Sequence, residues 1–136
     1  MRRFVTSLAA AAVAAAPLLP ASAGAKTEPI QVSVQPSAQL VDGGSIRVTV
    51  AVRCAPFGEP FEANVTVSQD DGFVWTQRGL PAATCDRRWH RYTVVATPFE
   101  GSFHRGTAYV SAYVSRMDPA TSEVRQGQDA RTVKVR

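Results

Sequence analysis

The densest group of side chains that could bind a partner lies in residues 86–92. Three arginines stand there among a tryptophan, a histidine and a tyrosine, in the order Asp86, Arg87, Arg88, Trp89, His90, Arg91 and Tyr92. Guanidinium groups and aromatic rings bind anions, glycans or nucleic acid through charge and stacking. A simpler interpretation places Arg87 and Arg88 in a turn. Alternation along a strand then points Trp89 and Arg91 outward and His90 and Tyr92 inward.

Tyr109 and Tyr113 form a second candidate surface, because they alternate with a stripe of alanine and valine. With Trp75 or Trp89 nearby, they would make an aromatic patch for contact with a protein or a glycan. Aromatic side chains on a solvated sheet face also serve as strand formers with cross-strand neighbours. The candidate binding residues are therefore Arg87, Arg88, Trp89, Arg91, Tyr109 and Tyr113.

Catalytic and metal-binding patterns are weak throughout the chain. His104 would need a positioned nucleophile and an orienting acid, and no Gly-x-Ser-x-Gly motif is present, so an exposed connector histidine is the simpler interpretation. Asp70 and Asp71, with Asp42, could bind calcium, but that ion takes about six to eight oxygens and a turn explains the pattern better. We expect no enzyme activity, no catalytic residue, no metal and no cofactor.

Cys54 and Cys85 are the only cysteines of the chain. An even count in an exported protein predicts a disulfide. Such a bond would close a loop of about 31 residues and stabilise the fold by about 3.5–4 kcal/mol in the loop-entropy model. A zinc site is not indicated, because no Cys-x-x-Cys spacing occurs and the two histidines are scattered.

The first 23 residues have the layout of a secretory signal peptide. Arg2 and Arg3 precede an apolar stretch over residues 4–19, and the small residues 21–23 fit a cleavage site. Cleavage after Ala23 is the first choice and after Ala25 the second. A membrane span needs about 20 apolar residues, and prolines interrupt this stretch. We expect a signal peptide over 1–23, a flexible segment over 24–29 and one domain over 30–136, secreted to the exterior or the cell envelope.

The net charge of the chain argues against nucleic acid as a partner. The formal net charge of +4 falls to +2 when Arg2 and Arg3 leave with the signal peptide. Nucleic-acid binding needs a concentrated basic stripe, which this chain does not have. We expect a monomer that binds no nucleic acid and, in its mature form, no membrane.

Apolar and polar residues alternate with the period of β-strands through the rest of the chain. The clearest face comprises Ile46, Val48, Val50, Val52 and Cys54. Strands are expected over residues 30–35, 46–54, 61–67, 73–77, 89–97, 108–115 and 133–135. Residues 55–60, 78–86, 98–106 and 117–127 are expected as loops, and 42–44 and 70–72 as turns. About seven strands with regular turn signals predict an all-β, immunoglobulin-like antiparallel sandwich. Its disulfide would attach the 78–86 loop to the end of the 46–54 strand.

The chain also resembles a known group of proteins. The resemblance is carried by Cys54, then Cys85 and Asp86, then Trp89 with residues 92–94, then residues 103–108 and 110–112. It points to small exported immunoglobulin-like proteins of actinobacteria whose domain has no known function. It implies a β-sandwich with one disulfide and export, and it supplies no catalytic residues to carry over.

The function expected from these observations is a secreted, non-catalytic binding or cell-envelope interaction module for an unknown protein or glycan. One alternative is a small-ligand carrier with a cleft between sheet and loops. A further alternative is a small secreted hydrolase or a protease inhibitor.

Overall fold

The computed structural model describes residues 28–136, which contain eight β-strands and one short 3₁₀ turn. The strands are β1 (Gln31–Val34), β2 (Ser37–Val41), β3 (Ser45–Arg53), β4 (Glu59–Gln69), β5 (Val74–Gly79), β6 (His90–Ala96), β7 (Gly106–Met117) and β8 (Val124–Val135), and the turn η1 is Asp70–Gly72. The all-β prediction is confirmed. The expected signal peptide and residues 24–27 lie outside the described residues.

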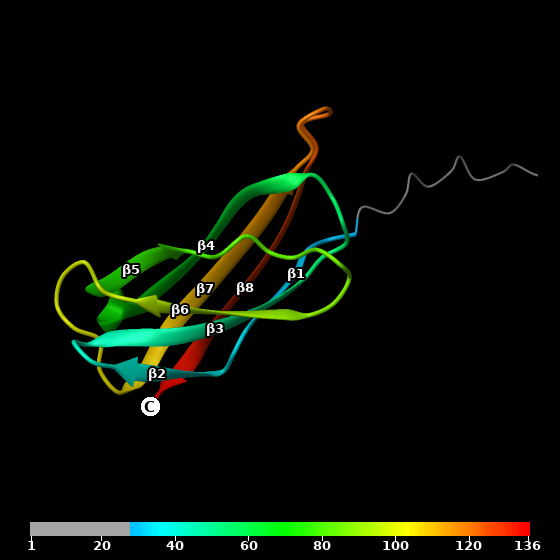
Figure 1. Cartoon of the computed structure of the whole chain (residues 1–136). Helices are drawn as coiled ribbons and strands as arrows, with labels where there is room; N and C mark the ends of the chain where they lie inside the picture. Colours follow the sequence, from blue (N-terminus) through cyan, green and yellow to red (C-terminus); the bar gives the residue numbers. More distant parts are fainter. Residues whose placement is uncertain (1–27) are drawn as a thin grey trace, which may run out of the picture.

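The strands form two ladders, which are joined through β2. In the first, β3 pairs with β6 on one edge and with β1 and then β2 on the other, all antiparallel. In the second, the antiparallel order is β8, β7, β4 and β5. β2 also pairs with β8 in parallel, so that all strands belong to one continuous sheet. Figure 1 shows β2, β3 and β6 as one layer crossing in front of β7 and β8.

Inward-facing aliphatic residues of both ladders meet in one core, which makes the fold sandwich-like. β3 contributes Ile46, Val48, Val50 and Val52, β4 contributes Val65 and Val67, β7 contributes Ala108, Val110, Ala112 and Val114, and β8 contributes Val133 and Val135. Alternation in the sequence predicted the buried faces of β3 and β7, and both are confirmed. Phe103, from the connector before β7, is also buried in this core.

Two expectations about strand number and length were wrong. The structure has eight strands rather than about seven, because β2 follows β1 after a break at Gln35 and Pro36. β8 begins at Val124, inside the stretch that was expected to be a loop. The inward-facing side chains in its first half are Arg125, Gly127, Asp129 and Arg131. Polar residues at these positions remove the apolar alternation that identifies a strand.

In the strand expected over residues 61–67, Phe61 alternates with Ala63, Val65 and Val67 as part of one apolar face, but it is 59% exposed. The register of β4 against β7 shifts between Pro60 and Glu62, which face Arg116 and Ser115. Phe61 is therefore the extra residue of a β-bulge, and a bulge displaces its residue from strict alternation.

β1 lies against the polar half of β8, and this contact explains the polar residues there. A Cβ atom at Gly127 would collide with the backbone carbonyl of Ile30, so only glycine lets the two backbones approach. The N–H of Val34 donates to Asp129 Oδ2 at 2.8 Å, and Arg131 Nη2 donates to the same oxygen at 3.2 Å. Asp129 thus binds the last N–H of β1, where the strand ends before Pro36.

Cys54 and Cys85 form the predicted disulfide, with their Cα atoms 4.6 Å apart. Cys54 follows the end of β3, and Cys85 lies in the segment before β6, as expected. Arg116, near the end of β7, reinforces this end of the molecule. Its guanidinium group donates to the carbonyls of Phe57 at 2.6 Å, Gly58 at 3.0 Å and Ala83 at 3.3 Å. The loops that carry the two cysteines are therefore also joined through one arginine.

We predict that Gly127→Ala destabilises the protein by about 2 kcal/mol or more, because the new methyl group forces β1 away from β8. Gly79→Ala is the matched control, since its Cβ would lie 4.0 Å from the backbone oxygen of Ala63, an ordinary contact distance. That change should alter stability by no more than about 0.5 kcal/mol. Urea unfolding of the three proteins gives the comparison. Equal losses in both variants would show that the approach of β1 to β8 is not tight.

We predict that replacing Cys54 and Cys85 together by serine lowers the free energy of unfolding by about 3.5–4 kcal/mol, because the 31-residue separation is no longer closed. Hydrogen exchange should rise in residues 80–89 and stay slow in β3 and β7. Fast exchange throughout β7 in the folded variant would contradict a local role for the disulfide.

Candidate functional site

The structure places the sequence-predicted binding residues in two groups that do not meet. Arg87, Arg88 and Trp89 lie in the turn before β6, and Arg91 follows on the outer face of β6, opposite Ala51 of β3. Tyr109 and Tyr113 lie on the outer face of β7, in the other ladder. The two groups therefore cannot form one binding surface.

The backbone of Arg87 is held in place by the end of β3. Its N–H donates to the carbonyl of Cys54 at 2.8 Å, and its own carbonyl accepts from Nε of Arg53 at 2.9 Å. These two bonds fix a left-handed residue with φ of +66°, an uncommon conformation for arginine. In this group, Arg53 therefore serves to shape the turn.

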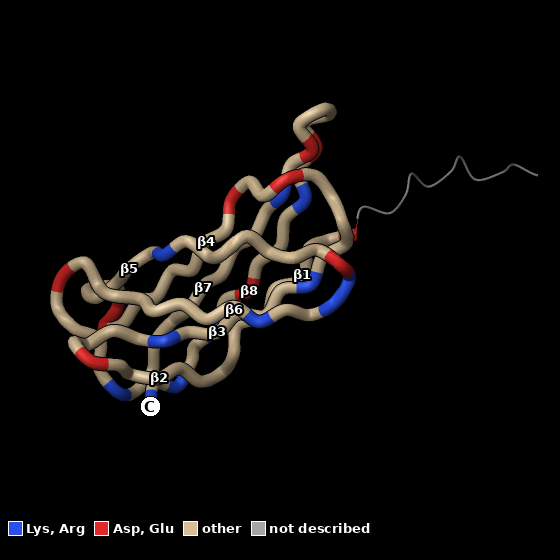
Figure 2. Tube along the Cα trace, in the orientation of Figure 1, with Lys and Arg blue, Asp and Glu red and all other residues tan. Residues whose placement is uncertain are grey.

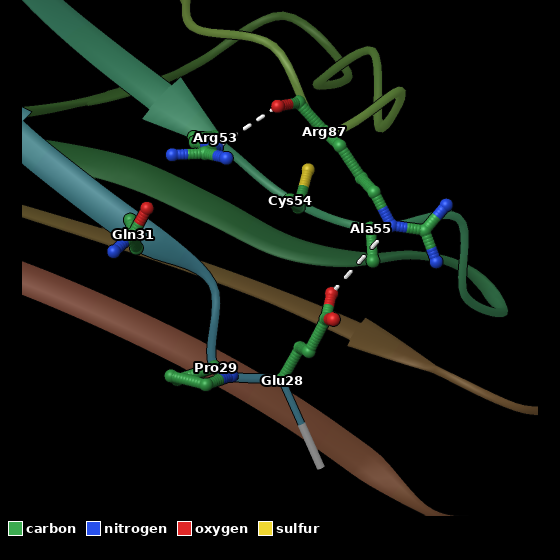
Figure 3. A pocket seen from close by; sticks show the side chains of 7 residues that line it. All are labelled: Glu28, Pro29, Gln31, Arg53, Cys54, Ala55 and Arg87. Carbon is green, nitrogen blue, oxygen red and sulfur yellow. Dashed lines mark hydrogen bonds and ion pairs between the residues drawn. The ribbon is translucent and has the colours of Figure 1, made fainter. Parts of the chain in front are cut away.

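A pocket of about 240 Å³ lies between this turn and the residues before β1. Figure 3 shows Arg53 and Arg87 together with Glu28, whose Oε2 lies 3.8 Å from Nε of Arg87. Both partners are exposed, and exposed ion pairs contribute little to stability. One carboxylate therefore faces one of the two guanidinium groups that line this pocket.

Asp86 and His90 form the polar pair of the same turn. Nε2 of His90 lies 2.7 Å from Oδ1 of Asp86, and the N–H of Arg88 donates to that oxygen at 3.0 Å. The hydrogen bond from His90, with a smaller effect from the N–H of Arg88, lowers the pKa of Asp86. Asp86 and His90 thus hold the turn that contains Arg87 and Arg88, in agreement with the simpler interpretation of that segment.

The outer face of β4, β5, β7 and β8 has a different chemistry. Three adjacent rows, set by the register of the ladder, cross the four strands in the middle of this face, between a row that contains Lys134 and a row that contains Glu62. They are Trp75, Ser68, Tyr109 and Thr132, then Gln77, Thr66, Ser111 and Ala130, then Gly79, Asn64, Tyr113 and Gln128. We call these rows the neutral face, because none of their residues is charged. Figure 2 shows β7 without a charged residue along its middle.

The neutral face includes one aromatic residue that the sequence left undecided. Trp75, not Trp89, shares a row with Tyr109, and both are about half exposed, at 47% and 53%. The ring of Trp75 meets that of Phe99 edge to face, with centroids 4.9 Å apart. Phe99 stands in a stretch expected only as a connector, and no local pattern relates it to Trp75.

A second pocket, of about 440 Å³, adjoins the first row of the neutral face. It lies between η1 and the strands β7 and β8, and it shares Ser68, Tyr109 and Thr132 with that row. Asp70 and Asp71 of η1 also line it. These aspartates were considered as calcium ligands, but Asp70 instead faces His104, with Nε2 3.0 Å from Oδ1 and 3.2 Å from Oδ2.

His104 is exposed, as expected, and both of its ring nitrogens face oxygen atoms. Nδ1 lies 2.8 Å from the carbonyl oxygen of Arg105, and Nε2 faces the carboxylate of Asp70. Both nitrogens can donate only in the charged ring. The carbonyl of Arg105, and then Asp70, therefore raise the pKa of His104 above its usual 6.5.

Within residues 28–136, no three His, Cys, Asp or Glu side chains are grouped so as to hold a metal ion. In the same range, no helix is both long enough and apolar enough to cross a bilayer.

We predict that the NMR titration midpoint of His104 lies above 6.5 and that Asp70→Asn lowers it only in part, because the larger effect comes from the Arg105 carbonyl. Asparagine tolerates the left-handed conformation of residue 70, where φ is +53°. The stabilisation from the charged ring is complete below 6.5 and disappears as the pH rises through the folded-state pKa. An unchanged midpoint in the variant would show that Asp70 does not contact the ring in solution.

Comparison with known proteins gives a family for this chain. No curated protein and no solved structure matched it. One family model matched residues 28–127, a stretch that contains β1 to β7, the start of β8 and the disulfide. The match covers more than half of the sequence, and the chain therefore belongs to the family of unknown function DUF6299.

Proposed function

We propose that this chain is a secreted, non-catalytic binding domain with an immunoglobulin-like fold, and that the neutral face is its binding surface. The partner is a protein or glycan outside the cell or in the cell envelope. The observation that carries the proposal is the neutral face itself. Three adjacent rows without charge expose Trp75 and Tyr109 among hydroxyl and amide side chains.

The strand arrangement supports an immunoglobulin-like fold. If β1 and β2 are two halves of one edge strand, the two ladders contain three and four strands. Those are the numbers of a constant-type immunoglobulin domain, whose sheets are antiparallel and pack face to face. The disulfide differs from the antibody pattern, because it joins a strand end to a loop instead of crossing the core.

The leader pattern of residues 1–23 and the disulfide together support export. Disulfides persist in oxidising compartments and are rare in the cytosol. On this basis we extend to the chain the export and the actinobacterial origin of the proteins that its sequence resembles.

The chemistry of the neutral face favours contact with a partner. Burying a charged side chain requires a large desolvation free energy, whereas neutral hydroxyl and amide groups lose less and can exchange water for partner hydrogen bonds. Tyrosine and tryptophan supply much of the binding free energy in interfaces. By contrast, the outer face of β3 and β6 exposes Arg47, Arg53 and Arg91, which stay hydrated.

The carrier, hydrolase and protease-inhibitor alternatives stay predictions. A carrier would need a cleft for a small molecule. The two pockets described above open at the surface, and the side chains between the layers are packed in one core.

We predict that Gln77→Arg abolishes capture of a partner by the immobilised mature protein, because it places an exposed charge within the neutral face. The bait is exposed to culture filtrate and cell-wall fractions of the producing organism. Thr93→Arg is the matched control, since Thr93 is an exposed neutral residue on the other edge strand, β6. Loss with Thr93→Arg and retention with Gln77→Arg would assign binding to the other face.

A further inference from the structure

We propose that the neutral face binds a neutral saccharide, with Trp75 and Tyr109 as stacking platforms and the pocket beside η1 as the site of one sugar unit. The inference rests on the proposed function, because it names the class of partner for the same surface. It is carried by three features of the described residues: the spacing of two rings, the polar lining of the pocket, and the bonds that hold this lining in place.

Trp75 and Tyr109 stand on either side of Ser68 in one row of the sheet. Neighbouring strands lie about 4.8 Å apart, so the two residues are separated by about 10 Å across the row. Ser68, between them, has a small side chain and lines the adjoining pocket. Two half-exposed aromatic residues at this spacing suit the flat C–H faces of successive sugar rings, which stack on aromatic side chains.

The adjoining pocket supplies hydrogen-bonding groups for the hydroxyls of a sugar. Its lining includes the hydroxyls of Ser68, Thr107 and Thr132 and the carboxylates of Asp70 and Asp71, beside the ring of Tyr109. Hydroxyls both donate and accept hydrogen bonds, and ionised carboxylates accept strong ones. At about 440 Å³, the pocket falls within the usual range for a ligand site, and one sugar unit would occupy only part of it.

The pocket wall is held by contacts with the 103–107 connector. The carboxylate of Asp70 faces Nε2 of His104. The buried side chain of Gln69 donates to the carbonyls of His104 at 2.7 Å and Thr107 at 3.2 Å, and its Oε1 accepts from the N–H of His104 at 2.8 Å. These bonds fix the acceptor groups before a ligand arrives, which lowers the ordering cost of binding.

The same lining disfavours other classes of partner. Among the described residues, the pocket is lined by two carboxylates and by no lysine or arginine, so an anionic saccharide would be repelled. The cores of protein interfaces are rich in large apolar residues and depleted in serine. Here Ser68, Thr66 and Ser111 occupy the space around the rings, which favours a ligand rich in hydroxyls.

The test measures binding of the mature protein to neutral hexasaccharides of glucose, mannose and galactose, in α- and β-linked forms, by NMR titration. A hexamer of galacturonic acid serves as the anionic comparison. We expect at least one neutral hexasaccharide to shift the signals of Trp75 and Tyr109 and the anionic one to leave them unchanged.

Three variants then locate the site. Tyr109→Ala should weaken binding by about tenfold or more, the loss expected for one stacking ring, and Tyr109→Phe should retain it. Asp71→Asn should weaken it by about threefold to tenfold, since the charged acceptor becomes a neutral one. Trp89→Ala, which removes a 49% exposed tryptophan outside the neutral face, should have no effect.

Saccharide binding that survives Tyr109→Ala, or that Trp89→Ala removes, would overturn the proposal. So would the absence of binding to every neutral hexasaccharide. In that last case, loss of capture from cell-wall fractions by Gln77→Arg would still uphold the neutral face as a binding surface, and the partner would then be a protein. If Gln77→Arg also left capture unchanged, the proposed function itself would fail.

Discussion

The arrangement of this domain depends on a change of backbone partner at Gln35 and Pro36. The N–H of Gln35 still donates to Thr49 of β3 at 3.0 Å, but the carbonyl of Pro36 accepts from Lys134 of β8 at 2.9 Å. From the next residue onward, β2 pairs with both β3 and the end of β8, and it exchanges further bonds with β8 between Ala38, Leu40 and Arg136. Proline suits this point because it has no N–H to donate and it interrupts a strand. A single continuous segment thereby joins both layers along one side of the molecule.

That junction determines where polar residues can enter the interior. Where β1 lies against β8, the two backbones meet at Gly127, and Asp129 accepts the N–H of Val34. Further along β8, Val133 and Val135 return to the shared core. The inward face of one strand is therefore polar in the half that contacts the crossing chain and apolar in the half that contacts side chains of the other layer. Close backbone contact, rather than apolar burial, holds the first half.

This division also explains which parts of the fold the sequence predicted. β3 and β7 pack through valine and alanine at every second position, so their burial could be inferred from local alternation. The disulfide followed from the cysteine count and the expected compartment. The start of β8 and the exposure of Phe61 were not predicted, because a polar inward face and a bulge depend on contacts with residues that are distant in the sequence. The neighbour of Tyr109 was undecided for the same reason, since only the pairing of β4 with both β5 and β7 selects Trp75 over Trp89.

The two outer faces of the domain differ in charge. A sheet face without charge that exposes aromatic rings favours association and reduces solubility. Arg47, Arg53 and Arg91 lie on the outer face of the opposite layer, where their guanidinium groups are exposed to water. Of the three arginines in segment 86–92, Arg91 lies on this charged outer face, in the layer opposite the neutral face. The sequence alone could not assign the arginines and the tyrosines to different faces, because both alternate with core residues in the same way. Only the assignment of β6 and β7 to different layers shows that the two groups face away from each other.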